Sequence, residues 1–183
     1  MDIRIVKEAG YHEALEGMTF SFKTECKLDE MENDYKKNMK TARTLAHKDG
    51  GHNKFLESMI IWVDIRASLT WWKQADTYRV GMTKLSKSTM HTLMRRRLTR
   101  WDFNNCISDD IIERLNTMID MGAFEKVIDY LPGAYMQTRR CCMNYKTLRN
   151  MISQRRGHKL PEWKDFIEGM LWSIKYPELV EKD

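Results

Sequence analysis

The sequence lacks the long apolar runs and the short motifs that identify many protein classes. No run of about 18 apolar residues would cross a bilayer, and the first residues have no apolar stretch like that of a signal peptide. The motifs GxGxxG, GxxxxGK(S/T), HExxH and GxSxG are also absent. These absences argue against Rossmann-type dinucleotide enzymes, P-loop proteins and serine hydrolases. We expect a cytoplasmic protein with no membrane partner.

Cysteine is scarce and poorly spaced for a structural role. Cys26 and Cys106 stand alone, and Cys141 and Cys142 are neighbours without a CxxC partner. A disulfide framework or a zinc site needs paired spacings. We therefore expect reduced thiols and no metal site.

The residues that are present are typical of one soluble globular domain, which we expect to span 1–183. Hydrophobic residues make up 42% of the chain and charged residues 31%, a composition that excludes a disordered polymer. Lys and Arg number 31 against 26 Asp and Glu, and the net charge of +5 suits an anionic ligand or partner. Because the two signs are interspersed, a solvated surface explains most of this excess as well.

The spacing of apolar residues predicts two strands among several helices. The strands lie around Ile3 and Ile5, before Gly10, and over 58–66, where β-branched and aromatic residues dominate. Segments with helical spacing or composition are 28–47, 67–75, 108–122, 134–154 and 160–174. Segment 11–22 fits a helix or a loop, and the Lys- and Ser-rich segment 78–90 is predicted to be a loop. This order indicates an α+β fold with a small sheet covered by helices, and apolar helix surface left over favours an oligomer.

The first candidate site lies within 52–88. His52 follows two glycines, where a turn lets a ring approach a ligand closely. Farther on, basic, amide and hydroxyl side chains mix with aromatic rings: Trp71, Trp72, Lys73, Gln74, Tyr78, Arg79, Lys84, Ser86, Lys87 and Ser88. This mixture is typical of a phosphate-contacting surface with planar groups for stacking. A solvated loop packed on buried tryptophans explains it equally well.

The second candidate site is segment 144–155. On a helix, Asn144, Leu148, Met151 and Arg155 share one face. Amide side chains offer donors and acceptors to the edge of a heterocycle, and arginine pairs with carbonyl or phosphate oxygens. A surface helix with these side chains in water is the alternative.

Both segments resemble motifs of the flavin-dependent thymidylate synthases. That family has a Leu-Pro pair followed, twelve residues after the Pro, by the pattern N-x-R-x-L-x-N-x-x-x-x-R. The matching residues here are Leu131-Pro132, Asn144, Lys146, Leu148, Asn150 and Arg155. The family also has a Gly-His pair 27 positions before the last Arg of an R-H-R signature, and Gly51-His52 and Arg79 have that spacing. Gln74 falls where the family has a nucleotide-contacting Gln.

The resemblance implies an α+β homotetramer with a small, mostly antiparallel sheet and FAD at the subunit interfaces. The implied reaction transfers a methylene group from methylenetetrahydrofolate to carbon 5 of dUMP and reduces it with a hydride that NADPH supplies through the flavin. The residues that would contact the flavin are His52, Arg79, Asn144 and Lys146, with Asn150 between flavin and nucleotide. Gln74 and Arg155 would hold the pyrimidine nucleotide at the reaction centre.

The sequence departs from the family pattern on both the flavin side and the nucleotide side. Thr77 and Tyr78 replace the first two residues of R-H-R, so a charge and an imidazole that contact the flavin in the family are missing. The signature continues after R-H-R as R-H-R-x-x-S-x-N-x-x-S-x-R, and its final Arg falls on Met90 when the second part is shifted by one residue. The arginine that the family has three positions before the Leu-Pro is Ile128. A guanidinium partner of the nucleotide phosphate is therefore missing.

These departures leave three interpretations of function. The first is a thymidylate synthase with a rebuilt phosphate pocket, in which Ser88 and either Lys84 or Lys87 contact the nucleotide. The second is a phage-type enzyme that acts on another pyrimidine nucleotide, such as dCMP, or forms a hydroxymethyl product. The third is an inactive homologue that binds nucleotide or nucleic acid, using the basic stretch 95–97. A nucleic-acid partner is not what we expect.

Overall fold

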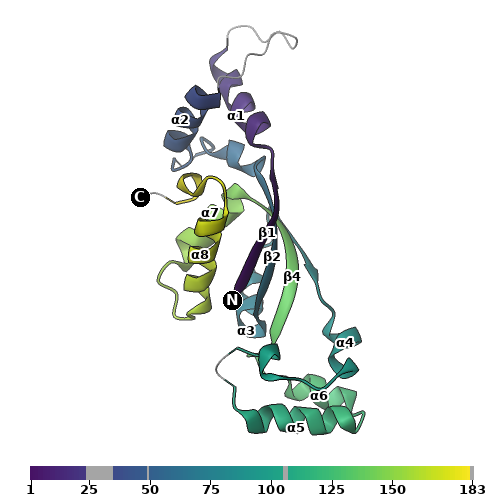
Figure 1. Ribbon diagram of the computed structural model, residues 1–183. Helices are drawn as coiled ribbons and strands as arrows, with labels where there is room; N and C mark the ends of the chain where they lie inside the picture. Colours follow the sequence, from purple (N-terminus) through teal and green to yellow (C-terminus); the bar gives the residue numbers. More distant parts are fainter. Residues whose placement is uncertain (24–34, 49, 105–106, 182–183) are drawn as a thin grey trace.

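A four-stranded antiparallel sheet forms the centre of the computed structural model, which describes residues 1–23, 35–48, 50–104 and 107–181 (Figure 1). The strands are β1 (Asp2–Ala9), β2 (Ile60–Ser68), β3 (Met82–Ser86) and β4 (Met136–Asn144). Their order in the sheet is β1-β2-β4-β3, with every neighbouring pair antiparallel. The predicted α+β fold with a small antiparallel sheet is confirmed.

Some helices cover one face of this sheet, and others lie beyond its two ends. Their bounds are α1 (Tyr11–Thr19), α2 (Tyr35–Leu45), α3 (Leu69–Ala75), α4 (Thr89–Thr92), α5 (Asp109–Asp120), α6 (Phe124–Tyr130), α7 (Tyr145–Arg155) and α8 (Glu162–Ser173). In Figure 1, α7 and α8 lie beside the sheet, α1 and α2 lie at one end of the elongated molecule, and α5 and α6 lie at the other.

The main core lies between the sheet and α3, α7 and α8. Along β2, Ile61, Val63 and Ile65 are fully buried, whereas Trp62 between them is 38% exposed. Successive side chains of a strand point to opposite faces, so one face of β2 packs against the helices and the other faces solvent. Helices α3, α7 and α8 add the large buried side chains of Trp71, Trp72, Tyr145, Leu148, Met151, Trp163, Phe166 and Met170. A smaller cluster, centred on Leu93, Phe103, Leu115 and Val127, holds α5 and α6 together.

Ion pairs span the open face of the sheet. Asp64 on β2 lies between Arg4 on β1 and Arg140 on β4, with Arg140 Nε 2.7 Å from one carboxylate oxygen and Arg4 Nη2 2.5 Å from the other. The hydrogen bond from Arg140, helped by the one from Arg4, lowers the pKa of Asp64 to about 2. The three outer-face side chains therefore tie three strands together while all carry their charges.

Most of the predicted elements are found where the sequence indicates them. Strands β1 and β2, helix α3, helix α5 and helix α8 confirm the segments expected near 3–9, 58–66, 67–75, 108–122 and 160–174. Segment 11–22, left open between helix and loop, is α1 followed by a short 3-10 turn. Helix α2 confirms the later part of the segment 28–47, whose residues 28–34 lie outside the described part of the chain.

Two predictions about secondary structure are wrong. Segment 134–154 is not one helix, because it forms β4 and then turns at Asn144 into α7. Segment 78–90 is not a loop throughout, because it contains β3, which pairs with β4 at one edge of the sheet. An edge strand needs few apolar residues, since only one side of its backbone pairs and one face is in water. The polar residues of β3 therefore do not indicate a strand from the sequence alone.

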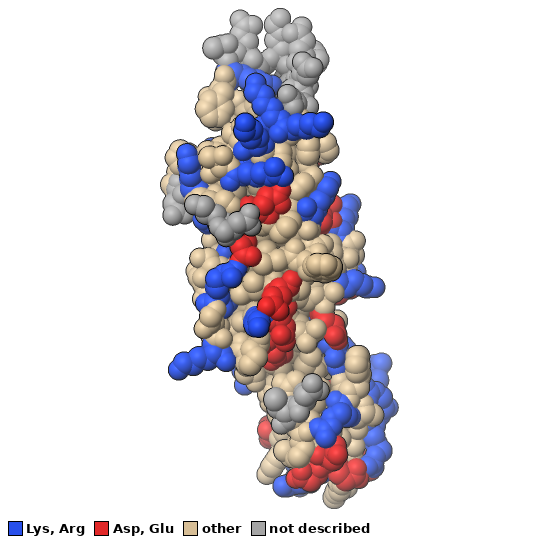
Figure 2. All heavy atoms as spheres, turned by 60° about the vertical axis from the view of Figure 1, so that its left-hand side comes forward, with Lys and Arg blue, Asp and Glu red and all other residues tan. Residues whose placement is uncertain are grey.

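Charges of both signs are spread over the surface. Figure 2 shows acidic and basic side chains interspersed on the side with α8, and basic side chains at the end with α1 and α2. Lys36, Lys37 and Lys40 of α2 are exposed. No helix in the described ranges is long and apolar enough to cross a membrane.

The thiols within the described residues are free. Cys141 is buried and Cys142 is half-buried, whereas Cys26 and Cys106 lie outside the described residues. Burial raises the pKa of the Cys141 thiol to about 12, so this thiol is protonated at neutral pH. No group of three or more potential metal ligands occurs within residues 1–23, 35–48, 50–104 and 107–181.

Candidate functional site

The start of α7 is held against the loop 77–81 by a set of short polar contacts. Asn144 caps α7, with its Oδ1 accepting from the Thr147 backbone N–H at 2.8 Å. The Thr147 hydroxyl donates to the carbonyl of Val80 at 2.9 Å, and the Asn144 N–H donates to the carbonyl of Gly81 at 3.1 Å. Gly81 has a φ of +67°, which a side chain rarely adopts. These contacts fix the loop beside the cap of the helix.

Tyr145, the first residue of α7, anchors the helix on its other side. Its hydroxyl donates to Glu8 Oε1 at 3.0 Å, lies 2.9 Å from the Tyr11 hydroxyl, and accepts from the Tyr176 N–H at 3.3 Å. Burial is the largest cause that raises the pKa of Tyr145 above its usual value. The neutral phenol therefore joins β1, α1 and the C-terminal segment to the start of α7.

Four of the predicted flavin residues line one pocket of about 560 Å³. Arg79 comes from the loop after α3, and Asn144, Lys146 and Asn150 come from the cap and first turns of α7. The pocket, here called the α7 pocket, is also lined by Thr77, Tyr78, Val80, Gly81, Thr147, Gln154 and Glu57. The spacing of the N-x-K-x-L-x-N block therefore predicts neighbours in space, although it begins at the end of a strand.

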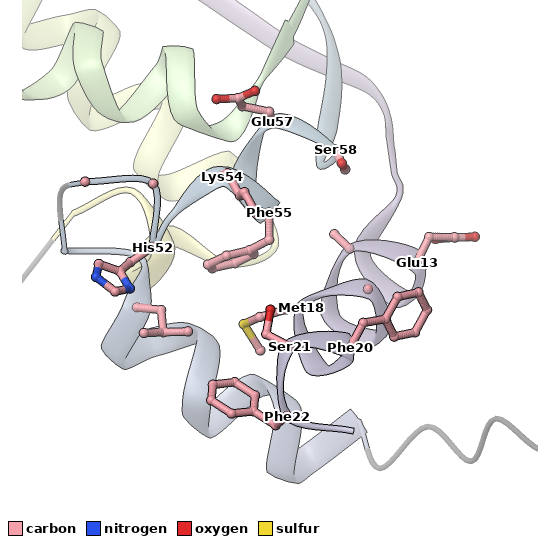
Figure 3. Close-up of a pocket in the computed structure, with 15 residues that line it drawn as sticks. Glu13, Met18, Phe20, Ser21, Phe22, His52, Lys54, Phe55, Glu57 and Ser58 are labelled. Atoms are coloured by element: carbon pink, nitrogen blue, oxygen red, sulfur yellow. The ribbon is translucent and has the colours of Figure 1, made fainter. Parts of the chain in front are cut away.

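The fifth predicted flavin residue, His52, lies in a neighbouring pocket of about 930 Å³ (Figure 3). This pocket, here called the α1 pocket, lies between α1, the Gly50-Gly51 turn and the 3-10 helix Lys54–Glu57. Its apolar lining residues are Ala14, Met18, Phe20, Phe22, Leu45 and Phe55. In Figure 3 the Phe55 ring and the Met18 side chain lie in the middle of this group, with His52 to one side.

Glu57 lines both pockets and was missed by the sequence analysis. Its Oε1 accepts from Lys146 Nζ at 2.6 Å, and both side chains are partly exposed. Lys146 stands where the family has Arg, and a lysine offers a compact charge in place of a planar fork. Nothing in the local sequence distinguishes this glutamate from others on the surface, so only the fold identifies it.

The two predicted nucleotide residues, Gln74 and Arg155, meet at Trp163 of α8. The Trp163 Nε1 donates to Gln74 Oε1 at 2.8 Å. The Arg155 guanidinium lies 4.8 Å from the centre of the Trp163 ring, and its Nε donates to the Tyr78 hydroxyl at 2.9 Å. The Tyr78 hydroxyl in turn donates to Gln154 Oε1 at 3.0 Å. Trp163 falls within the predicted helical segment 160–174, but nothing in the sequence indicates that it joins the two nucleotide residues.

The other predicted substrate residues are engaged within the chain. Lys84 Nζ donates to the Tyr78 carbonyl at 2.8 Å and lies 3.5 Å from Asp76 Oδ1. Asp76 also accepts from Arg139 at 2.8 Å. Ser88 Oγ accepts from the His91 N–H at 3.3 Å and caps α4. Neither Lys84 nor Ser88 lines the two pockets described above.

The basic stretch 95–97 is largely engaged in ion pairs. Arg96 forms two hydrogen bonds to the carboxylate of Asp102, at 2.8 and 2.6 Å. Arg97 pairs with Glu113 and Asp120. The Arg97 pairs join the segment to α5, and the Arg96 pair joins it to the 3-10 turn Arg100–Asp102. Two of the three arginines are therefore already paired and offer little charge to a polyanion.

Comparison with solved structures supports the fold, whereas the sequence comparisons find no match. No protein-family model matches the sequence, and no curated protein matches it. Two crystal structures of the flavin-dependent thymidylate synthase ThyX from Helicobacter pylori with FAD and dUMP have TM-scores of 0.82. They are 13% and 14% identical, and the matches cover 97% and 99% of this chain and 95% and 98% of those chains.

A third structure with a similar fold is a UMP/dUMP methylase, PolB from Streptomyces cacaoi, bound with 5-Br dUMP. Its TM-score is 0.66 at 12% identity, and the match covers 98% of this chain and 93% of that chain. Low identity with nearly complete coverage indicates a diverged sequence on a common architecture. The fold of this chain is that of the flavin-dependent thymidylate synthases.

Proposed function

We propose that this chain is an enzyme that binds FAD and transfers a one-carbon unit to carbon 5 of a pyrimidine deoxynucleotide, dUMP in the first instance. The observation that carries the proposal is the α7 pocket, where Arg79, Asn144, Lys146 and Asn150 meet. Residue 79 and residues 144–150 are far apart in sequence, and the family resemblance gives them one shared role. Structures with the same fold hold FAD and dUMP, which supports the same ligand classes here.

The polar groups of the α7 pocket suit a flavin ring. Asn144 uses its oxygen on the Thr147 N–H, so its amide nitrogen remains as a donor toward the pocket. The side chains of Arg79 and Asn150 have no polar partner among the described residues. A flavin presents carbonyl oxygens and ring nitrogens along one edge, and donors of this kind satisfy them. A volume of about 560 Å³ is within the range of small-molecule sites, roughly 300–1,000 Å³.

In this proposal the protein binds and orients, and the cofactors carry the chemistry. FAD would supply the hydride-transfer step, with methylenetetrahydrofolate as one-carbon donor and NADPH as reductant. His52, on the other side of Glu57, would contact the same flavin from the α1 pocket. Arg155 and Gln74 would hold the nucleotide through hydrogen bonds to its oxygen atoms.

The phosphate contact would differ from the family pattern. Lys84 holds the Tyr78 carbonyl and Asp76, so its role toward the nucleotide would be to fix the loop 77–81. The Lys87 side chain is exposed and has no polar partner within the described ranges. We assign the phosphate to Lys87 together with Ser88, whose hydroxyl hydrogen is free to donate while its oxygen caps α4.

A second copy of the chain would complete the α7 pocket. The pocket opens to solvent, and Val80 on its lining is 89% exposed. We therefore propose the homotetramer that the family resemblance implies, with flavin sites between subunits.

The test is turnover of the purified protein with FAD, methylenetetrahydrofolate and NADPH, using dUMP and dCMP separately and identifying products by mass spectrometry. We expect a methylated product from dUMP. Flavin affinity in Arg79→Ala should be roughly 10–100-fold weaker, since a hydrogen bond to a charged group contributes roughly 1.5–3 kcal/mol. Arg95→Ala is the matched control, because Arg95 is exposed and distant from both pockets. A hydroxymethyl product or reaction with dCMP would replace the methylase assignment, and absence of flavin binding would refute the enzyme.

A further inference from the structure

Two aromatic side chains from different parts of the fold pack against the Arg155 guanidinium. Trp163 from α8 lies under its guanidinium at 4.8 Å, and the Tyr78 ring lies 5.5 Å from it. The two rings also contact each other edge to face, with centroids 6.1 Å apart. The Tyr78 hydroxyl accepts a hydrogen bond from the Arg155 Nε–H and donates one to Gln154 Oε1. Both hydrogen bonds therefore run in the same donor-to-acceptor direction, from Arg155 through Tyr78 to Gln154.

The groups that this arrangement leaves unused are all donors. The four terminal N–H groups of Arg155 have no partner among the residues that the structure describes, and the amide NH₂ of Gln74 has none there either. The Gln74 amide oxygen accepts from the Trp163 indole N–H. This hydrogen bond orients the amide so that its NH₂ group faces away from Trp163. Two donor groups on a common aromatic support suit a ligand that presents oxygen acceptors.

We propose that Tyr78 and Trp163 are positioning residues that hold Arg155 and Gln74 ready for the nucleotide. The inference rests on the proposed function, in which Arg155 and Gln74 bind the pyrimidine nucleotide. A free arginine loses much rotamer freedom when it binds a ligand, and a side chain already fixed by stacking and by one hydrogen bond loses less. Tyr78 and Trp163, here called the clamp, therefore strengthen nucleotide binding without contacting the nucleotide themselves.

The proposal also gives a role to a departure from the family pattern. Tyr78 stands where the resemblance has a flavin-contacting His. Its hydroxyl is used on both sides by Arg155 and Gln154, and its backbone carbonyl accepts from Lys84. The side chain at this position thus acts on the nucleotide side of the site, and flavin affinity depends on the neighbouring Arg79 and on α7.

The test removes the phenolic oxygen and keeps the ring. Tyr78→Phe is expected to weaken dUMP binding to the FAD-loaded protein about fivefold by calorimetry, the size of one net hydrogen bond. Tyr78 also lines the α7 pocket, but its phenolic oxygen is used by Arg155 and Gln154, so flavin affinity is expected to change less than dUMP affinity. Tyr130→Phe is the matched control, because Tyr130 is 62% exposed on α6 at the far end of the molecule. Trp163→Phe keeps a stacking ring but removes the donor to Gln74, and should also weaken dUMP binding.

A second readout follows Arg155 directly and needs no ligand. In ¹H–¹⁵N spectra the Arg155 Nε–H signal, identified by its loss in Arg155→Lys, should be protected from exchange and should move in Tyr78→Phe but not in Tyr130→Phe. An unmoved signal would overturn the clamp even if dUMP binds. Unchanged dUMP affinity in Tyr78→Phe would overturn its role in binding, whereas failure of the parent protein to bind dUMP would refute the proposed function together with it.

Discussion

A single methyl group at Gly81 would disturb the α7 pocket at its tightest point. Gly81 has a φ of +67°, and a Cβ there would lie 2.5 Å from Thr147 Oγ1 and 2.6 Å from Asn144 Nδ2. The left-handed backbone costs an alanine about 1–2 kcal/mol. Displacing Thr147 also weakens its hydrogen bond to the Val80 carbonyl, worth about 1 kcal/mol. We expect Gly81→Ala to destabilise the protein by about 2–3 kcal/mol.

Gly122→Ala separates the two contributions. Gly122 has nearly the same φ, +68°, but nothing lies within 4 Å of its ideal Cβ, so this variant should lose only the backbone part. At about 2–4 °C per kcal/mol for a chain of this size, thermal unfolding followed by circular dichroism resolves the difference. Flavin affinity should fall in Gly81→Ala alone, because the displaced Asn144 amide lines the pocket. Equal melting temperatures in the two variants, with equal flavin affinity, would refute the packing described for the loop 77–81.

Two further predictions concern the nucleotide and the open face of the sheet. Arg155→Ala should weaken dUMP binding roughly 10–100-fold in calorimetry while far-UV circular dichroism stays unchanged, and an unaltered affinity would remove Arg155 from the site. Asp64 has a folded-state pKa of about 2, below its value of about 3.9 in an unfolded chain; its contribution to stability is therefore complete above about pH 5 and is lost as the pH falls toward 2. Asp64→Asn should thus show a smaller loss of urea midpoint between pH 6 and pH 3 than the parent, and equal losses would contradict the ion pairs with Arg4 and Arg140.

The boundary between β4 and α7 shows where sequence periodicity stops being informative. Along β4, Gln137, Cys141 and Met143 face the core while Thr138 and Arg140 face outward. Cysteine, methionine and arginine have no strong preference for strands, and the helix pattern of α7 begins directly after Asn144. The two segments therefore merge into one apparent helix. Only pairing with β2, which is distant in sequence, separates them.

Motif spacing indicated residues that lie together in the α7 pocket, whereas Lys84 and Ser88 line neither described pocket. Asn144, Lys146 and Asn150 lie on one cap and helix, so their spacing along the chain fixes their spacing in space. Ser88 and Lys84 lie on a short edge strand and its following turn, where a shift of one residue reverses the direction of every side chain. Trp163 and Glu57 enter the site from elements with no motif, so the packing of α8 and of the turn before β2 had to be known first.

The absorbance spectrum of the FAD-loaded protein, recorded before and after addition of dUMP, tests the central claim most directly. The proposed enzyme should retain FAD through the α7 pocket, and dUMP at Arg155 and Gln74 should shift the flavin band at saturating nucleotide. The same shift should be absent in Arg155→Ala and present in Arg95→Ala. A protein that binds no FAD, or whose flavin spectrum is insensitive to every pyrimidine nucleotide, would contradict a flavin-dependent nucleotide enzyme.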